Sequence, residues 1–256
     1  MTMTNLPLLD EILNSRMVQD VDGNQLPLTS EVDAGEGELL AKMVSENKVS
    51  KTIEVGCAYG ISSLYICGAL SQKESPSHTI IDPFQNTDWN GIGVNNLKRA
   101  GIDFFELIEE PSEYALPRLC QEGKKYDLAL IDGNHTLDHT LVDFFFVNML
   151  LNEGGIVLID DLTFPGIKKV IRYVLNYPNY EICGAANQCL DNGSTKRKVV
   201  DAGMRGISKL LPWSYANDVF AQSWRNSDFD LGIVCTMIAL RKTGPDLRPW
   251  DWYEPF

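Results

Sequence analysis

The chain has 256 residues, of which 44% are hydrophobic and 22% charged, and its formal net charge is −13. This composition is ordinary for a folded globular protein, and the length fits an α/β domain with insertions. The acidic balance argues against nucleic acid as a partner, because such proteins usually carry a basic stripe, and we interpret the basic run 196–198 as a solvated loop.

Residues 1–35 are predicted to form a helical extension, and an amphipathic helix is predicted over 36–48. Strand-like and helix-like segments then alternate five times. The strands are predicted at 51–55, 78–82, 102–108, 126–132 and 154–160, and the helices that follow them begin near 61, 91, 112, 136 and 166. Five such units predict a doubly wound, mainly parallel sheet with helices on both faces. The strands are continuously apolar, as expected when both faces of a sheet are buried.

The carboxyl-terminal part departs from this rhythm. Residues 180–185 are predicted as a sixth strand and residues 231–240 as a seventh. The polar segment 186–230 lies between them, and three interpretations of it stay open: a cap over the site, a dimer contact or a loosely ordered excursion. We assign residues 36–256 to one domain, with 186–230 as an insertion or cap.

Two glycines follow the first predicted strand, in the spacing Glu54-x-Gly56-x-x-x-Gly60. This turn lies at the carboxyl end of the strand, where doubly wound sheets bind their ligands. The spacing differs from the GxGxxG of nicotinamide and flavin enzymes. The glycines are explained either by a tight turn or by a ligand that approaches the backbone.

An acidic residue ends the second predicted strand. Asp82 lies 22 residues after Gly60, a separation at which an acid can accept hydrogen bonds from both hydroxyls of a ribose. The alternative is that Asp82 caps a helix before Pro83.

The segment from about Leu39 to Asn176 resembles class I S-adenosylmethionine-dependent methyltransferases, through the phrases "IDGNH" (131–135) and "LLNEGGIVLIDD" (150–161). It is most similar to small-molecule O-methyltransferases of the catechol type and of the macrolide and aminocoumarin sugar type. The resemblance implies a Rossmann-like sheet of seven strands with an antiparallel last strand. Residues 1–30 and 186–230 carry no resemblance.

The resemblance also implies S-adenosylmethionine as the cofactor. Gly56 and Gly60 would admit its methionine part, Glu54 would orient its amino group, Asp82 would hold the ribose and Ser112 would lie beside the adenine. Glu110 and Pro111 depart from the Gly-Asp-Ser-like turn that is usual before this serine. The full set of predicted cofactor-binding residues is Glu54, Gly56, Tyr59, Gly60, Asp82, Ser112 and Asp132.

Three carboxylates end neighbouring predicted strands. Asp160 and Asp161 lie 28 and 29 residues after Asp132, which resembles the spacing in metal-dependent sugar O-methyltransferases. Adjacent parallel strands lie less than ~5 Å apart, so these residues could converge on a hard cation such as Mg²⁺. Such an ion would hold two neighbouring hydroxyls and lower the pKa of one. Alternatively, Asp132 contacts the cofactor, as in many metal-free relatives, and the Asp pair caps the next helix.

A neutral hydroxyl needs a base, and the predicted catalytic residue is His135. Histidine titrates near neutrality and can take up a proton at working pH. Asn134 occupies a position where some relatives have an acid, and an amide cannot serve as a base, so the role falls to His135 or to a metal-bound hydroxide. His139 lies on the same face four residues later, and we interpret it as a surface residue.

These features predict an enzyme that transfers a methyl group from S-adenosylmethionine to a hydroxyl of a small molecule. A natural-product or sugar-type acceptor and assistance by Mg²⁺ are parts of this prediction. Two alternatives stay open: a nicotinamide-dependent oxidoreductase, and a non-catalytic module that binds S-adenosylmethionine.

The cellular location of the protein is predicted from features that the sequence lacks. Six cysteines include no CxxC pair, the amino terminus has no signal-peptide pattern, and no apolar stretch reaches the ~18 residues of a membrane span. We therefore expect a reduced, cytoplasmic protein without a membrane partner. Its expected partner is the small-molecule acceptor, and a homo-oligomer is one option.

Overall fold

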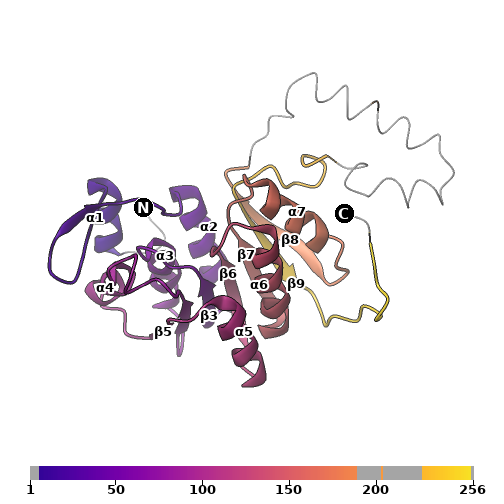
Figure 1. Cartoon of the computed structure of the whole chain (residues 1–256), viewed down its shortest axis with the longest axis horizontal. Helices are drawn as coiled ribbons and strands as arrows, with labels where there is room; N and C mark the ends of the chain where they lie inside the picture. Colours follow the sequence, from indigo (N-terminus) through magenta and orange to yellow (C-terminus); the bar gives the residue numbers. More distant parts are fainter. Residues whose placement is uncertain (1–5, 189–202, 204–226, 255–256) are drawn as a thin grey trace.

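The computed structural model describes residues 6–188, 203 and 227–254. A seven-stranded sheet runs through the molecule, with strand order β5-β4-β3-β6-β7-β9-β8 and helices on either side (Figure 1). Its five parallel strands are β3 (Lys51–Val55), β4 (Ser77–Ile81), β5 (Phe105–Ile108), β6 (Tyr126–Ile131) and β7 (Leu151–Ile159). The order reverses at β3, because the chain extends the sheet first toward β5 and then from β6 toward β8.

The last two strands complete the sheet in antiparallel fashion. Strand β9 (Met237–Lys242) lies between β7 and β8 (Tyr180–Ala186) and is antiparallel to both. The predicted class, a doubly wound Rossmann-like methyltransferase sheet with an antiparallel last strand, is confirmed. The predicted start of β9 at residue 231 is wrong, because Gly232 has a φ of +70° in a turn. The apolar residues Ile233 and Cys235 of this segment are buried in the core rather than paired in a strand.

In the described part of the chain, helices cover both faces of the sheet. Leu128 and Leu130 of β6 pack into the core under α2 (Ala34–Ser45), α3 (Ile61–Leu70) and α4 (Ile92–Arg99). Ala129 and Ile131 pack into the core under α5 (Ser112–Gln121), α6 (Leu137–Leu150) and α7 (Pro165–Val174). Alternate residues of one strand therefore belong to opposite cores, as the side-chain period of two requires.

The amino-terminal extension is less helical than predicted. Within its described residues it contains one helix, α1 (Pro7–Ser15), followed by a hairpin of β1 (Met17–Gln19) and β2 (Gln25–Pro27). Helix α2 then begins with a capping box: the Glu36 amide donates to the Asp33 carboxylate at 3.0 Å, and the Asp33 amide donates to Glu36 at 2.7 Å. These bonds satisfy two amides that would otherwise be unpaired at the start of the helix.

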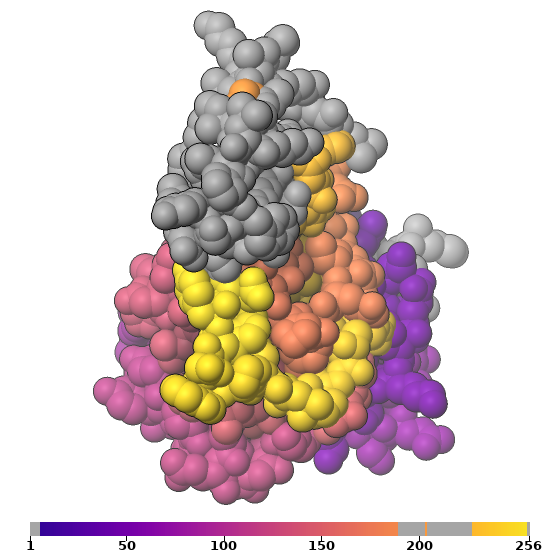
Figure 2. Space-filling model, turned by 90° about the vertical axis from the view of Figure 1, so that its right-hand side faces the viewer, coloured from indigo at the N-terminus to yellow at the C-terminus, as the bar shows by residue number. Residues whose placement is uncertain are grey.

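The segment after β9 lies across the outside of the sheet's far end, where Figure 2 shows it in yellow against α7 and β8 in orange. The Arg248 guanidinium lies 3.4 Å from the centroid of the Tyr177 ring and pairs with Asp246. Asp246 in turn accepts a hydrogen bond from the Asn148 amide of α6 at 3.3 Å. Most of the segment 186–230, for which we proposed an insertion or cap, lies outside the described residues.

Within the described ranges, each helix is too short or too polar to cross a bilayer. The cysteines in the same ranges, Cys57, Cys67, Cys120, Cys183 and Cys235, are all free thiols.

Candidate active site

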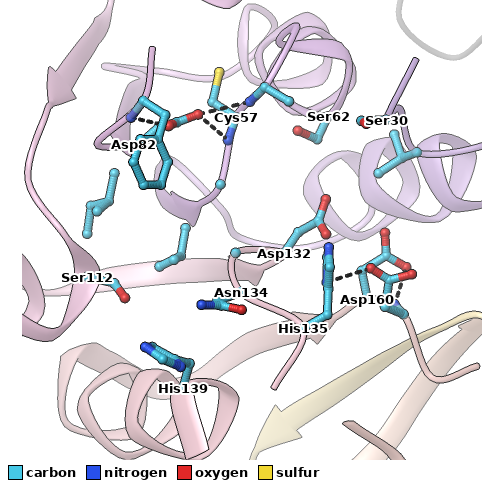
Figure 3. A pocket seen from close by; sticks show the side chains of 18 of the residues that line it. Ser30, Cys57, Ser62, Asp82, Ser112, Asp132, Asn134, His135, His139 and Asp160 are labelled. Carbon is cyan, nitrogen blue, oxygen red and sulfur yellow. Dashed lines mark hydrogen bonds and ion pairs between the residues drawn. The ribbon is translucent and has the colours of Figure 1, made fainter. Parts of the chain in front are cut away.

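A cleft of about 740 Å³ opens at the carboxyl ends of β3, β4, β6 and β7. Its wall includes Val55, Ile81, Asp132 and Asp160, which are the last residues of these strands or the first after them. Figure 3 shows Ser112, Asn134 and His139 toward one end and Asp132, His135 and Asp160 toward the other, with Asp82 above Ser112 on a separate wall. The volume lies in the range of small-molecule and cofactor sites.

The turn after β3, which contains Gly56 and Gly60, packs closely against neighbouring backbone. Gly56 and Gly60 have φ of +88° and +76°, a region that disfavours side chains. A Cβ on Gly56 would lie 2.0 Å from the Asp132 carbonyl oxygen, and one on Gly60 would lie 2.9 Å from the Gly93 carbonyl oxygen. Gly56 lines the cleft, whereas Gly60 caps α3. Glycine is therefore required at both positions before any ligand is considered, and a substitution there would disturb the fold as well as binding.

Asp82 organises the same turn. Its Oδ2 accepts hydrogen bonds from the amides of Cys57 and Ala58 at 3.1 and 3.0 Å, and its Oδ1 accepts one from the Phe84 amide at 2.9 Å. The side chain lines the cleft but the residue is 3% exposed. Asp82 thus joins the end of β4 to the turn after β3, and its predicted contact with a ribose stays a prediction.

Two other predicted cofactor residues lie behind the wall of the cleft. The carboxylate of Glu54 is fully buried and accepts hydrogen bonds from the hydroxyls of Ser62, at 3.3 Å, and Ser63. Ser62 itself lines the cleft. The ring of Tyr59 packs edge-on against Trp89, with centroids 5.2 Å apart, and Trp89 lines the cleft. Glu54 and Tyr59 therefore support residues of the wall.

The three predicted metal-binding acids all line the cleft. Burial raises the pKa of Asp132 well above its usual range, and the nearby charges of Asp160 and Asp161 raise it further. Burial and the charge of Glu36 likewise raise the pKa of Asp160. Carboxylates so close together repel one another when ionised. This end of the cleft therefore favours a bound positive charge.

His135 joins this group. Its Nδ1 lies 2.8 Å from Asp161 Oδ2, and its ring stacks on Phe164 at a centroid distance of 5.4 Å and an interplanar angle of 7°. The hydrogen bond to Asp161 raises the pKa of His135 above 6.5. Asp161 has a φ of +61°, a strained conformation of the kind that clusters at functional sites.

The atoms that could bind a cation differ from the predicted set. Within the described residues, one ligand atom from each of Asp132, His135 and Asp161 lies within 4.8 Å of the other two. Asp160 is adjacent, but its Oδ1 accepts the Asp161 amide at 2.8 Å and it is outside this group. Two carboxylates and an imidazole form a donor set that fits Mn²⁺ or a later transition metal as well as Mg²⁺.

Several residues that line the cleft were not among the predicted site residues: Glu31, Glu36, Phe84, Trp89 and Phe164. Glu36 could have been located at a helix start from the spacing Asp33-x-x-Glu36, but nothing in that spacing indicates that it faces a site. The three aromatic residues lie in loops after strands, and their positions depend on loop conformation.

Comparisons with known proteins find similarity to methyltransferases. A family model described as a methyltransferase domain matches residues 53–162. Catechol O-methyltransferase B of Danio rerio is 31% identical over 152 residues, which cover 57% of this chain and 55% of that protein. Catechol O-methyltransferase of Bos taurus is 25% identical over 203 residues, which cover 76% of this chain and 69% of that protein. The chain thus spans little more than half the length of the first relative.

Solved structures agree on the fold. An O-methyltransferase from Bacillus cereus in complex with SAH has a TM-score of 0.56 and 17% identity, over 68% of this chain and 81% of that one. At this identity the likeness concerns the arrangement of the strands and helices.

Proposed function

We propose that this chain, in which residues 53–162 match a methyltransferase-domain model and which is similar to catechol O-methyltransferases, transfers the methyl group of S-adenosylmethionine to a hydroxyl of a small molecule, as a class I S-adenosylmethionine-dependent methyltransferase. The observation that carries this proposal is the convergence of Asp132, His135 and Asp161 in the cleft that the glycine turn also lines. A site for the methyl donor and a group able to take up a proton then share one cavity.

The proposed base is His135. Because its Nδ1 is hydrogen-bonded to Asp161, the lone pair of its Nε2 would take the proton of the acceptor hydroxyl as the new O–C bond forms. The bond between sulfur and the methyl carbon breaks in the same step, and its electron pair stays on sulfur, so that S-adenosylhomocysteine is the leaving group. Asp161 fixes the orientation of the ring and stabilises the imidazolium that results. Proton transfer of this kind contributes typically about 10²–10⁴-fold to a rate.

A divalent cation fits the same end of the cleft. Asp132 and Asp161 would hold it, with Asp160 or His135 as a further ligand, and its repulsive carboxylate surroundings support the assignment. When bound, it would orient two neighbouring hydroxyls and lower the pKa of one. Mg²⁺ was expected; a His135 ligand would instead favour a transition metal and would remove His135 from the role of base.

The charge of the cleft limits the classes of acceptor that can bind there. Seven of the described lining residues are acidic and none is lysine or arginine; the acids are Glu31, Glu36, Asp82, Glu113, Asp132, Asp160 and Asp161. An anionic acceptor would meet repulsion here without a compensating partner. We therefore propose a neutral or cationic acceptor with neighbouring hydroxyls, such as a phenol, a sugar or a natural product.

A matched pair of acceptors tests this proposal. 3,4-Dihydroxybenzylamine and 3,4-dihydroxybenzoate differ in the charge of one substituent and share the two hydroxyls. With S-adenosylmethionine and Mg²⁺ or Mn²⁺, the amine should be methylated at least about tenfold more efficiently, since one avoided close charge repulsion is worth more than 1.4 kcal/mol. A preference for the benzoate would contradict the acceptor class.

The same assay separates the alternatives. Binding of S-adenosylmethionine without turnover of a broad hydroxylated panel would favour a non-catalytic module. Binding of NADH by calorimetry, with none of S-adenosylmethionine, would favour an oxidoreductase.

A further inference from the structure

Asp143 is a buried acid whose hydrogen bonding is incomplete. It lies in α6 and is 2% exposed, and its Oδ1 is fully buried without a hydrogen-bond partner among the described residues. Buried polar atoms in native proteins are nearly always paired, and leaving one unpaired is costly. Such an atom calls for an explanation, and a role in keeping a neighbouring ligand site a hydrogen-bond acceptor is one.

Asp127 illustrates the hydrogen bonding of an acid that has a purely structural role. Asp127, at the other end of β6, accepts hydrogen bonds from the amides of Ser50 and Lys51 at 3.0 and 3.1 Å and from Asn152 at 2.8 Å. Asp127 thus receives donors on both oxygens. Asp143 lacks this kind of environment.

Asp143 lies directly behind the wall of the cleft. Its Oδ2 would be 3.8 Å from a Cβ on Gly133, and its carboxylate interacts with the hydroxyl of Ser112. Gly133, Ser112 and His139 all line the cleft. Because Gly133 has no side chain, nothing from that residue covers the carboxylate on the cleft side.

Ser112 and His139 lie at the end of the cleft that is away from the carboxylates of Asp132 and Asp160 (Figure 3). If the methyl donor binds as proposed, its sulfonium lies near the acceptor and His135, and we place its purine at the remaining end of the cleft, toward Ser112. The inference that follows therefore rests on the proposed function.

We propose that Asp143 selects a purine with an amino group at position 6, by keeping this end of the cleft a hydrogen-bond acceptor. An ionised carboxylate accepts but cannot donate. The Ser112 hydroxyl donates its proton toward Asp143 and turns its remaining lone pairs to the cleft. A 6-amino group donates to this wall, whereas a 6-oxo group is repelled by it.

The charge balance around Asp143 agrees with this role. Burial raises the pKa of Asp143 to about 6, while the hydrogen bond from Ser112 and the charge of His139 act in the opposite direction. The carboxylate is therefore ionised at neutral pH yet poorly solvated, which strengthens its attraction for a donor from a ligand.

The test compares S-adenosylhomocysteine with S-inosylhomocysteine, which has an oxo group in place of the 6-amino group, by titration calorimetry. The wild-type protein should bind the adenine compound at least about tenfold more tightly, as expected for a hydrogen bond to a charged group. Asp143→Asn keeps the shape and adds a donor, so the preference should fall below about threefold. Asp127→Asn is the matched control and should keep the wild-type preference.

The outcomes separate the two levels of the proposal. Failure of the wild type to bind either compound overturns the proposed function and this inference with it. Tight binding of S-adenosylhomocysteine, with an unchanged preference in Asp143→Asn or an equal loss for both compounds, leaves the proposed function standing and overturns the role of Asp143. If thermal melting shows Asp143→Asn to be unfolded, Asp143→Ser gives the same reading, because it also removes the charged acceptor.

Discussion

The imidazole of His135 and the carboxylate of Asp161 are joined at 2.8 Å, although they belong to loops after different strands. His135 follows β6 and Asp161 follows β7, and these strands are paired in parallel. The pair is therefore produced by the sheet, which brings the ends of two neighbouring strands together. Asp161 fixes which nitrogen of His135 faces away from it, and this determines the chemistry available to the cleft.

Replacing His135 should reduce turnover without reducing cofactor binding. His135→Gln removes the group that takes up the acceptor proton, so kcat should fall by about 10²-fold or more, while the Kd for S-adenosylhomocysteine should change less than about twofold. His139→Gln is the control and should change kcat less than about threefold. Equal kcat values for the two variants would exclude His135 as the base.

The pairing with Asp161 should be visible in the titration of His135. The hydrogen bond raises the pKa of His135 above 6.5, so NMR titration of the metal-free protein should give a midpoint above that value. In Asp161→Asn the midpoint should move down, because the charge that stabilises the imidazolium is lost. As a base, His135 must be neutral, so the wild-type rate should rise with pH through the same midpoint. Identical midpoints in the two proteins would contradict the pairing.

Chelation should abolish methyl transfer, and Mg²⁺ or Mn²⁺ should restore it. Asp132→Asn and Asp161→Asn should each require at least about tenfold more cation for half-maximal activity, since each loses a charged ligand whose hydrogen-bond or ion contacts are typically worth 1.5–3 kcal/mol. Asp160→Asn should require less of an increase, because its carboxylate is engaged with the Asp161 amide.

Cofactor binding supplies the control for this prediction. Asp160→Asn and Asp161→Asn should bind S-adenosylhomocysteine with wild-type affinity, because the cation serves the acceptor, whereas Asp132 is also a predicted contact of the cofactor. A rate that survives exhaustive chelation would remove the cation from the mechanism and leave the acids as contacts to the protein and the methyl donor.

The sheet was predictable because its signals are local. The strand β3 was predicted at its observed bounds, Lys51–Val55, since a β-branched run ends there at a glycine. The same locality misled at β9: residues 231–236 are as apolar as a strand, but they form a turn and a bend in which Ile233 and Cys235 are buried. Apolar composition reports burial, and pairing with a neighbouring strand must be established separately.

The site was predictable where strand ends determine it. Asp82, Asp132, Asp160 and Asp161 line the cleft because each follows a parallel strand. Glu54 could not be placed in the same way, because its carboxylate accepts a hydrogen bond from Ser63 of α3 behind the wall of the cleft. Asp143 carried no signal at all: a single acid in a helix is usually a solvated residue, and its burial against Ser112 and Gly133 depends on how α5 and α6 pack.

The raised pKa of Asp143 has a consequence for stability. With a pKa of about 6 when folded against 3.8 ordinarily, the folded chain binds this proton more tightly than the unfolded chain. That contribution is fully present below about pH 3.8 and is lost as the pH rises through about 6, at a cost of up to about 3 kcal/mol. Asp143→Asn cannot titrate, so urea unfolding of the ligand-free proteins should show the wild type losing stability relative to the variant between pH 4 and 7. The charges of Glu113 and His139 also act on this carboxyl, and both residues are present in the two proteins compared. Parallel stability curves over this range would mean that Asp143 is solvated in the native state and is not the buried acceptor described above.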